Sequence, residues 1–360
     1  MITVDVVMPF GGYRGGIENV MYEWSRGLPD DEFNLRFFNV SPGLSDYLKG
    51  YKNQWTLPMP KEKMDRLTVE YIAGAYAFFI DNQGAPDICI ANWVPICSKA
   101  CVIARESKKM SFPVLSYMHT KIAIYESLGY GTVKDMAFAD AHICISKAVE
   151  NEILAVIPNA LTLMVGNPLK RVNIDGYDPD EFTLCYAGRL GAEKKVETII
   201  TALSKTKDRR WNILIAGDGV AKDGLVKLTD ELGLNGRVSF LGWMEEPWEA
   251  LKKAKYCVLS SEYEGWNAMA REASSIGMTV ISTPVGGVVD YLMPGQNGYL
   301  YPVGSSDDLA IILDNLAEGK LPACNPEVCK KSVEGCYTDK YFENIKNIFR
   351  TITSEDLKTG

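Results

Sequence analysis

The stretch TLCYAGRLGAEKKVETIITALSKTKDRRWNILIAGDG (residues 183–219) shows the repeating unit of this chain most clearly. Residues 183–187 form a short apolar run of the length of a buried strand, and residues 196–205 have a helical pattern. A second apolar run follows at residues 211–216. A strand, a helix and a strand in this order predict a βαβ unit, in which a crossover helix joins two parallel strands.

The same alternation extends along almost the whole chain in two series. The first series predicts strands at residues 3–8, 35–39, 88–91, 114–117, 142–145 and 163–165, with helices clearest at 17–27, 64–82 and 147–154. The second adds strands at 238–241, 256–259, 279–282 and 298–301, and helices at 224–232, 248–253, 268–276 and 307–315. Residues 166–181, GNPLKRVNIDGYDPDE, are rich in residues typical of turns and indicate a linker.

We therefore predict an α/β protein with two Rossmann-like, doubly wound domains, at residues 1–168 and 169–335. The carboxyl ends of both sheets are expected to face a central cleft, because ligands of doubly wound sheets bind at those ends. Residues 336–360 carry a last helix near 339–351, which we expect to pack back on the first domain.

Composition excludes several classes of protein. The chain has 360 residues, 47% of them apolar and 23% charged, as in an ordinary globular protein of two domains. A net charge of −8 argues against nucleic acid as a partner. The chain has no uncharged apolar run of about eighteen residues and no signal-peptide pattern. The nine scattered cysteines favour reduced, buried thiols, so we expect a cytoplasmic protein.

A glycine-rich loop, GGYRGGIENV (residues 11–20), follows the first predicted strand. Gly15 and Gly16 open a helix there, and the free N–H groups of a helix N-terminus suit an anion. The spacing is not that of the dinucleotide fingerprint GxGxxG. The loop therefore predicts either a phosphate contact or a turn that is needed only for packing.

Two further loops carry charged residues directly after strands. Arg189 and Lys194 follow the strand at 183–187, where two cations can neutralise a pyrophosphate. Glu264 precedes a predicted helix N-terminus, and Glu272 lies about two turns along that helix. Both carboxylates could accept hydrogen bonds from sugar and ribose hydroxyls. Solvated surface charge is the alternative explanation for all four side chains.

Several motifs occur together in a particular order: AGRL-x3-K (residues 187–194), IAGDG (215–219), VSFLG (238–242), the Glu264–Glu272 pair, PVGG (284–287) and PGQNGYLYPVG (294–304). This set resembles the retaining GT-B glycosyltransferases of family 4, also called glycosyl transferases group 1. GGIE (15–18), His119, ISKAV (145–149) and GNP (166–168) fit the same family, so the resemblance spans nearly the whole chain. FLGWMEEPW (240–248) is also similar to the lipopolysaccharide-core galactosyltransferase branch.

The resemblance implies a role for each matching residue. Arg189 and Lys194 would hold the donor diphosphate, Glu264 would lie by the donor sugar, and Glu272 would bind the ribose hydroxyls. His119 would meet a donor-sugar hydroxyl, whereas we expect His142 to be a core residue. The remaining donor contacts would come from Gly15, Gly16, Gly217, Gly242, Gly265, Trp266, Asn267 and Ala268. The sequence departs from the family pattern at Lys195, Trp266 and Arg271, where glycine, phenylalanine and an aliphatic residue are usual.

The expected reaction is transfer of a hexose, with retention, from a nucleotide-sugar to a glycan or lipid-linked acceptor. The donor would be a UDP-sugar such as UDP-glucose, UDP-galactose or UDP-N-acetylglucosamine, and neither metal nor cofactor is expected. We interpret Asp178 and Asp180 as turn residues, and residues 53–65 as a stretch that helps select the acceptor. Membrane association would be at most peripheral, at the inner face. The alternatives are a nucleotide-sugar epimerase and a non-catalytic partner subunit of another transferase.

Overall fold

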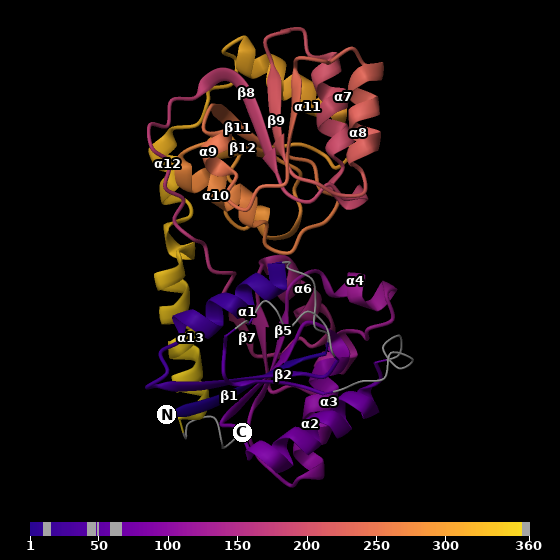
Figure 1. Cartoon of the computed structure of the whole chain (residues 1–360), viewed down its shortest axis with the longest axis vertical. Helices are drawn as coiled ribbons and strands as arrows, with labels where there is room; N and C mark the ends of the chain where they lie inside the picture. The colour runs from indigo at the N-terminus through magenta and orange to yellow at the C-terminus, as the bar shows by residue number, and fades with distance from the viewer. Residues whose placement is uncertain (10–15, 42–47, 49, 58–66, 355–360) are drawn as a thin grey trace. The chain divides into compact units, whose positions relative to one another are not determined.

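The computed structural model describes residues 1–9, 16–41, 48, 50–57 and 67–354. The chain divides into two compact units (Figure 1). Unit 1 comprises Met1–Pro168 together with Thr338–Gly360, and unit 2 comprises Leu169–Tyr337. Each unit contains a wholly parallel sheet, so both are of the Rossmann-like type that the sequence predicts.

The sheet of unit 1 has the strand order β3-β2-β1-β4-β5-β6-β7. Its strands are β1 (Ile2–Met8), β2 (Phe33–Asn39), β3 (Gln54–Thr56), β4 (Ile88–Asn92), β5 (Val114–Met118), β6 (Ala141–Cys144) and β7 (Thr162–Met164). β1, β4 and β5 are buried along their length except at the start of β1, which explains their continuous apolar sequences. The order reverses direction beside β1, where β2 and β4 pair on either side of it.

The helices of unit 1 cover this sheet on both faces. They are α1 (Gly16–Gly27), α2 (Val69–Gln83), α3 (Pro95–Ser107), α4 (Ile122–Ser127), α5 (Val133–Met136), α6 (Lys147–Val156) and α13 (Thr338–Thr353). α13 passes beside α1 and contacts the C-terminal part of that helix (Figure 1). The Trp24 indole N–H donates to the Tyr341 hydroxyl at 2.7 Å, and its ring packs edge-on against Phe349. A Cβ on Gly27 would lie 2.1 Å from the Phe342 ring, so glycine permits this close approach.

The sheet of unit 2 has the strand order β10-β9-β8-β11-β12-β13. Its strands are β8 (Asp180–Ala187), β9 (Asn212–Ala216), β10 (Val238–Gly242), β11 (Ala254–Leu259), β12 (Thr279–Ser282) and β13 (Gly298–Leu300). Its helices are α7 (Val196–Lys205), α8 (Lys222–Glu231), α9 (Trp248–Leu251), α10 (Ala268–Ile276), α11 (Ser306–Ala317) and α12 (Pro326–Lys331). α7, α8 and α11 group on one side of the sheet and α9, α10 and α12 on the other (Figure 1).

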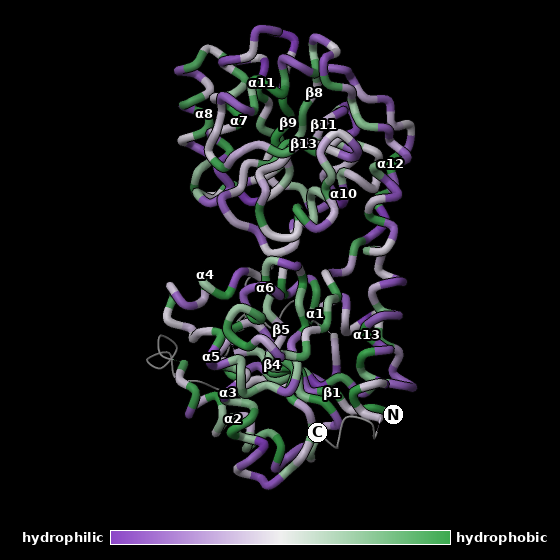
Figure 2. The backbone as a smooth tube through the Cα atoms, turned by 180° about the vertical axis from the view of Figure 1, so that it is seen from behind, coloured by the Kyte–Doolittle hydropathy of each residue, from purple (hydrophilic) through white to green (hydrophobic). Residues whose placement is uncertain are grey.

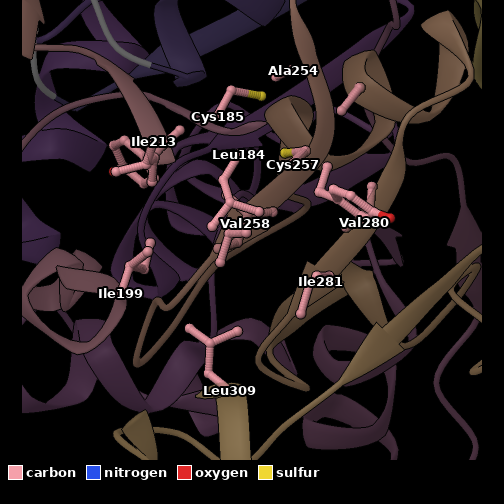
Figure 3. Packing of buried hydrophobic residues seen from close by; sticks show 14 of the residues in the cluster. Leu184, Cys185, Ile199, Ile213, Ala254, Cys257, Val258, Val280, Ile281 and Leu309 are labelled. Carbon is pink, nitrogen blue, oxygen red and sulfur yellow. The ribbon is translucent and has the colours of Figure 1, made fainter. Parts of the chain in front are cut away.

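Side chains from the central strands and the covering helices form one core in unit 2. Leu184, Val258 and Ile281 of the strands meet Ile199 of α7 and Leu309 of α11 (Figure 3). Apolar residues follow the strands of both units, whereas hydrophilic residues lie mainly on the outer helices and loops (Figure 2). Among the described residues, no helix is both long and apolar enough to cross a bilayer.

Several boundaries differ from those predicted. β8 begins at Asp180, three residues early, because the Asp180 amide donates to the Lys253 carbonyl and pairs this end of β8 with β11. The linker at residues 166–181 is correspondingly shorter. β3 and α3 were not predicted: β3 has only three residues, and α3 starts at a proline and contains two cysteines. Nine cysteines are free, and Cys97 and Cys101 are buried on α3.

Candidate active site

The loops after β8 and β11 meet through an ion pair. Both strands are parallel neighbours, so their carboxyl ends lie at one edge of the sheet. The Lys194 ammonium lies 2.7 Å from one Glu264 carboxylate oxygen, although the two residues are 70 positions apart. The Ser261 hydroxyl donates to the same oxygen at 2.7 Å. The side chains of Lys194 and Glu264 are 20% and 15% exposed, so this pair is desolvated in part but remains accessible.

Arg189 lies in the same loop as Lys194 but is much more exposed, at 64% of its side chain. Its guanidinium pairs with Glu193, which is mostly buried. Lys195 adopts a left-handed conformation with φ of 50°, which explains why glycine is usual at this position in the family that the sequence resembles. Arg189 and Lys194 are therefore both paired with carboxylates, and an anionic ligand would compete with Glu193 and Glu264 for them.

The turn at residues 264–267 leads into α10. Asn267 has φ of 61°, and its side-chain oxygen accepts from the Ala270 amide at 3.1 Å, which caps the helix. Trp266 and Asn267 are buried, whereas Ala268, the first residue of α10, is exposed. The helix has nine residues, and the N–H groups and dipole of its first turn favour an anion there.

Glu272 lies on α10 and is held by a residue that sequence reasoning did not single out. The Trp248 indole N–H, at the start of α9, donates to a Glu272 carboxylate oxygen at 3.0 Å. Burial raises the pKa of Glu272, and the hydrogen bond from Trp248 opposes that rise. The signal for Trp248 was present in the motif FLGWMEEPW, which ends at this tryptophan. The bond fixes the orientation of the carboxylate.

Two predicted glycines lie at the same edge of the sheet: Gly217 directly follows β9, and Gly242 is the last residue of β10. A Cβ on Gly217 would lie 2.0 Å from the Gly188 carbonyl oxygen, and its amide donates to the Gly242 carbonyl at 2.7 Å. Gly217 therefore permits close packing of these loops, and Gly242 adopts φ of 79° in open space. Trp243 follows directly and is 68% exposed, a surface aromatic that sequence reasoning also missed.

His119 follows β5 in unit 1 and is buried beside Asn92, the last residue of β4. The His119 Nε2 atom lies 2.7 Å from the Asn92 side-chain oxygen. The Asn92 amide nitrogen donates to the sulfur of Met8, so its oxygen faces the imidazole, and Nε2 must carry the hydrogen. The other nitrogen, Nδ1, has no partner among the described residues and remains an acceptor. Burial lowers the pKa of His119 to about 3, so the ring is neutral.

His142 makes a different kind of contact. Its Nδ1 lies 2.7 Å from the Ser116 hydroxyl on the neighbouring strand, and the side chain is buried in the sheet, where we expected it. Gly16 is the exposed first residue of α1, whereas Gly15 and the rest of its loop, at 10–15, lie outside the described residues. So do residues 58–65 of the stretch expected to help select the acceptor.

The aspartates of the Asp178-Pro179-Asp180 segment lie at the opposite edge of the unit 2 sheet. Asp180 begins β8, and Asp178 faces Lys253 at 3.6 Å. They are therefore remote from Lys194 and Glu264. Within the described ranges of the chain, no group of three or more His, Cys, Asp or Glu side chains is arranged to hold a metal ion.

Two Rossmann-like units, each with a wholly parallel sheet, are the architecture of the GT-B fold. Residues 172–331 match the family model described as glycosyl transferases group 1. The chain is 27% identical over 363 residues to the lipopolysaccharide 1,6-galactosyltransferase of Salmonella typhimurium, covering 95% of this chain and 96% of the relative. The chain is therefore a glycosyltransferase of the GT-B fold, and over nearly its whole length it is similar to a lipopolysaccharide-core galactosyltransferase.

Solved structures share the fold over nearly the full length. A lipopolysaccharide outer core galactosyltransferase in its apo form superposes with a TM-score of 0.83 at 23% identity, covering 97% of this chain and 100% of that one. The Anabaena protein HepE, solved in complex with UDP, gives a TM-score of 0.78 at 17% identity, covering 98% and 100%. At these identities the likeness establishes the fold alone.

Proposed function

We propose that this enzyme transfers a hexose from a UDP-sugar to a glycan or lipid-linked acceptor, with retention of anomeric configuration and without a metal ion. The observation that carries the proposal is the Lys194–Glu264 pair at the carboxyl edge of unit 2, beside the N-terminus of α10. A cation, a carboxylate and a helix N-terminus at one point suit a ligand that carries both a diphosphate and hydroxyl groups.

The chemistry follows from where charge develops. When the bond between the anomeric carbon and the diphosphate breaks, its electron pair stays on the phosphate oxygen and the sugar becomes oxocarbenium-like. Lys194, Arg189 and the first turn of α10 would stabilise the negative charge of the departing diphosphate. The reaction would depend on this positioned charge, and no protein side chain would act as a nucleophile. The acceptor hydroxyl then forms the new bond to carbon, and its proton passes to the departing diphosphate oxygen, so that the products are the glycosylated acceptor and UDP. Glu264 would lie by the sugar, where positive charge builds.

Glu272 and His119 would bind hydroxyl groups of the donor. The Glu272 carboxylate, oriented by Trp248, would accept hydrogen bonds from the ribose. The neutral His119 would accept one from a sugar hydroxyl through its free Nδ1. Gly16, Gly217, Gly242 and the backbone at 265–268 would complete the donor contacts.

The relatives support a choice among donors. HepE binds UDP, and the Salmonella relative is named as a galactosyltransferase of lipopolysaccharide, so UDP-galactose is the first donor to test, before UDP-glucose and UDP-N-acetylglucosamine.

We also propose that any association with membranes is peripheral, at the inner face. Washing membranes with high salt should then release the protein, and retention in the pellet would contradict this.

The deciding experiment incubates the enzyme with each UDP-sugar and measures released UDP with and without a lipopolysaccharide-core acceptor. We expect acceptor-dependent UDP release and a product whose anomeric configuration, read by NMR, matches that of the donor. An epimerase would change the sugar without releasing UDP in proportion. A non-catalytic partner subunit would bind UDP but turn over no donor with any acceptor.

A further inference from the structure

Arg271 lies on α10 beside Glu272 and is one of the most buried charged residues of the chain, with 3% of its surface exposed. One terminal nitrogen of its guanidinium donates to the Trp266 carbonyl oxygen, in the turn before α10. The other terminal nitrogen donates to the Gly287 carbonyl oxygen at 2.7 Å. The side chain thus joins the turn before α10 to the loop that contains Gly287, 21 residues further along the chain.

Two aromatic rings enclose the guanidinium. Its central carbon lies 4.1 Å from the centre of the Trp266 ring and 4.5 Å from that of Tyr291. A planar guanidinium can stack on aromatic rings while donating from its edges, and an ammonium group cannot do both. The arrangement therefore depends on arginine rather than on positive charge alone.

The two loops are also packed backbone against backbone. The Gly287 amide donates to the Gly265 carbonyl at 2.9 Å. Gly286 has φ of 54°, and a Cβ there would lie 2.3 Å from the Glu264 carbonyl oxygen. The backbone of the turn at residues 264–267 is thus packed against residues 286–287. Arg271 adds a second link, because it donates hydrogen bonds to Trp266 of the turn and to Gly287. Asn267, which follows Trp266, is in the left-handed conformation.

Stability alone does not explain a buried arginine at this position. Burial lowers the pKa of Arg271, which reflects the cost of removing its charge from water. Well-packed apolar residues usually replace buried charges without loss of stability. What the guanidinium adds is a fixed geometry between two backbone carbonyls, next to the residues proposed to bind the donor.

We propose that Arg271 is a positioning residue of the donor site, which sets the conformation of the turn 264–267 for the sugar and diphosphate of the bound donor. The inference rests on the proposed function, because that function assigns Glu264 and the start of α10 to the donor. Arg271 itself is buried behind the turn and acts through it.

The test is Arg271→Lys, with Arg237→Lys as the matched control. Arg237 also bonds to a backbone carbonyl, that of Trp211 at 2.8 Å, but it precedes β10 and so lies at the opposite edge of the same sheet. Calorimetric titration with UDP, steady-state kinetics with the best donor, and chemical unfolding are measured on both variants. Displacing a binding turn by about 1 Å can cost up to about 100-fold.

We expect Arg271→Lys to weaken UDP binding about tenfold and to lower kcat/KM by about ten- to 100-fold. We expect Arg237→Lys to change only the unfolding transition. If Arg271→Lys binds UDP and turns over donor as the wild type does, the inference is wrong even when its unfolding transition has moved. If the wild-type chain binds no UDP, the proposed function fails first, and the inference fails with it.

A second variant decides the matter if Arg271→Lys does not fold. Gly287→Ala keeps Arg271 but places a Cβ 3.1 Å from the Trp266 carbonyl oxygen, so it presses on the same turn from the other side. We expect weaker UDP binding from this change as well, by a smaller factor. Unchanged affinity in a folded Gly287→Ala protein would overturn the inference.

Discussion

The carboxyl edges of the two sheets are built from different chemistry. In unit 2, the loops after β8 and β11 carry paired charges, Arg189 with Glu193 and Lys194 with Glu264, all within reach of solvent. In unit 1, β4 ends at Asn92 and β5 is followed by His119, and these two residues are neutral, buried and hydrogen-bonded to each other. Under the proposed function, unit 2 would stabilise the charge of the leaving group, whereas unit 1 would offer hydrogen bonds to uncharged hydroxyls.

The largest effect should come from removing a cation of unit 2. We expect Lys194→Ala or Arg189→Ala to lower turnover by about two to three powers of ten, as when one preorganised charge-stabilising group is lost. Lys227→Ala is the control, since Lys227 pairs with Glu231 on the exposed side of α8. Initial rates at saturating donor measure all three. Near-native turnover in the first two variants would contradict the assignment of the diphosphate.

Substitution of Glu272 should affect the affinity for UDP, whereas substitution of Glu264 should affect turnover. Glu272→Gln weakens charge-assisted hydrogen bonds of about 1.5–3 kcal/mol, so we expect weaker binding of donor and of UDP alike. Glu264→Gln should mainly lower turnover and leave UDP affinity near native, because UDP has no sugar to contact. Calorimetric titrations with UDP beside steady-state kinetics resolve the two. Equal, small effects would indicate ordinary surface carboxylates.

The two histidines of unit 1 provide a smaller contrast. We expect His119→Ala to lower kcat/KM by about tenfold through loss of one neutral hydrogen bond to the sugar, of about 0.5–1.5 kcal/mol. His142→Asn should lower the free energy of unfolding and leave kcat/KM of the folded protein unchanged. Kinetics and chemical unfolding are measured on both proteins. The same kinetic loss in both variants would show that His119 acts only through folding.

Acid should weaken unit 1 through these same residues. Burial lowers the pKa of His142 to about 4 and that of His119 to about 3, whereas both take up a proton near pH 6.5 when unfolded. The unfolded state therefore binds more protons below pH 6.5, and stability falls as pH decreases from there. Each histidine should contribute roughly 1–2 kcal/mol of loss between pH 7 and 5. Unfolding titrations of the wild type and His142→Asn at both pH values would measure it.

The smallest effect is expected from chelation. If side-chain cations and the α10 N-terminus stabilise the diphosphate, turnover should be the same in excess EDTA as in its absence. The measurement is the UDP-release assay with and without EDTA, followed by addition of Mn²⁺ or Mg²⁺. Loss of activity that these ions restore would show that the leaving group depends on a metal.

Much of the fold could be predicted because its signals are local. Short apolar runs bounded by turn residues predicted twelve strands within a few residues, and α7 and α10 match their predicted bounds. β3 could not be predicted, since Gln54–Thr56 is too short for a pattern and is recognisable only by its pairing with β2. The start of β8 depends likewise on a tertiary partner, Lys253.

The sequence predicts which residues belong to the candidate site but not which of them contact each other. A resemblance in motifs names Lys194 and Glu264, but their direct contact across 70 positions becomes visible only when β8 and β11 pair. The partner of Arg189 and the two-loop bridge of Arg271 have no sequence signature of their own, and the motif that contains Trp248 does not show that this residue bonds to Glu272. Each depends on side-chain directions that spacing along the chain does not encode.

The packing of α13 has a consequence for the order in which the protein matures on the ribosome. Trp24 and Phe33, synthesised near the start, find Tyr341 and Phe349 only after the whole of unit 2 has been translated. Domains generally fold in the order of their synthesis. Here unit 2, Leu169–Tyr337, is a continuous segment that can complete its core before α13 is made. Unit 1 lacks α13 until then, so the side chains of Trp24 and Phe33 remain uncovered. We therefore expect nascent chains to expose these aromatic side chains while unit 2 and α13 are synthesised, and a chaperone could bind them during that time.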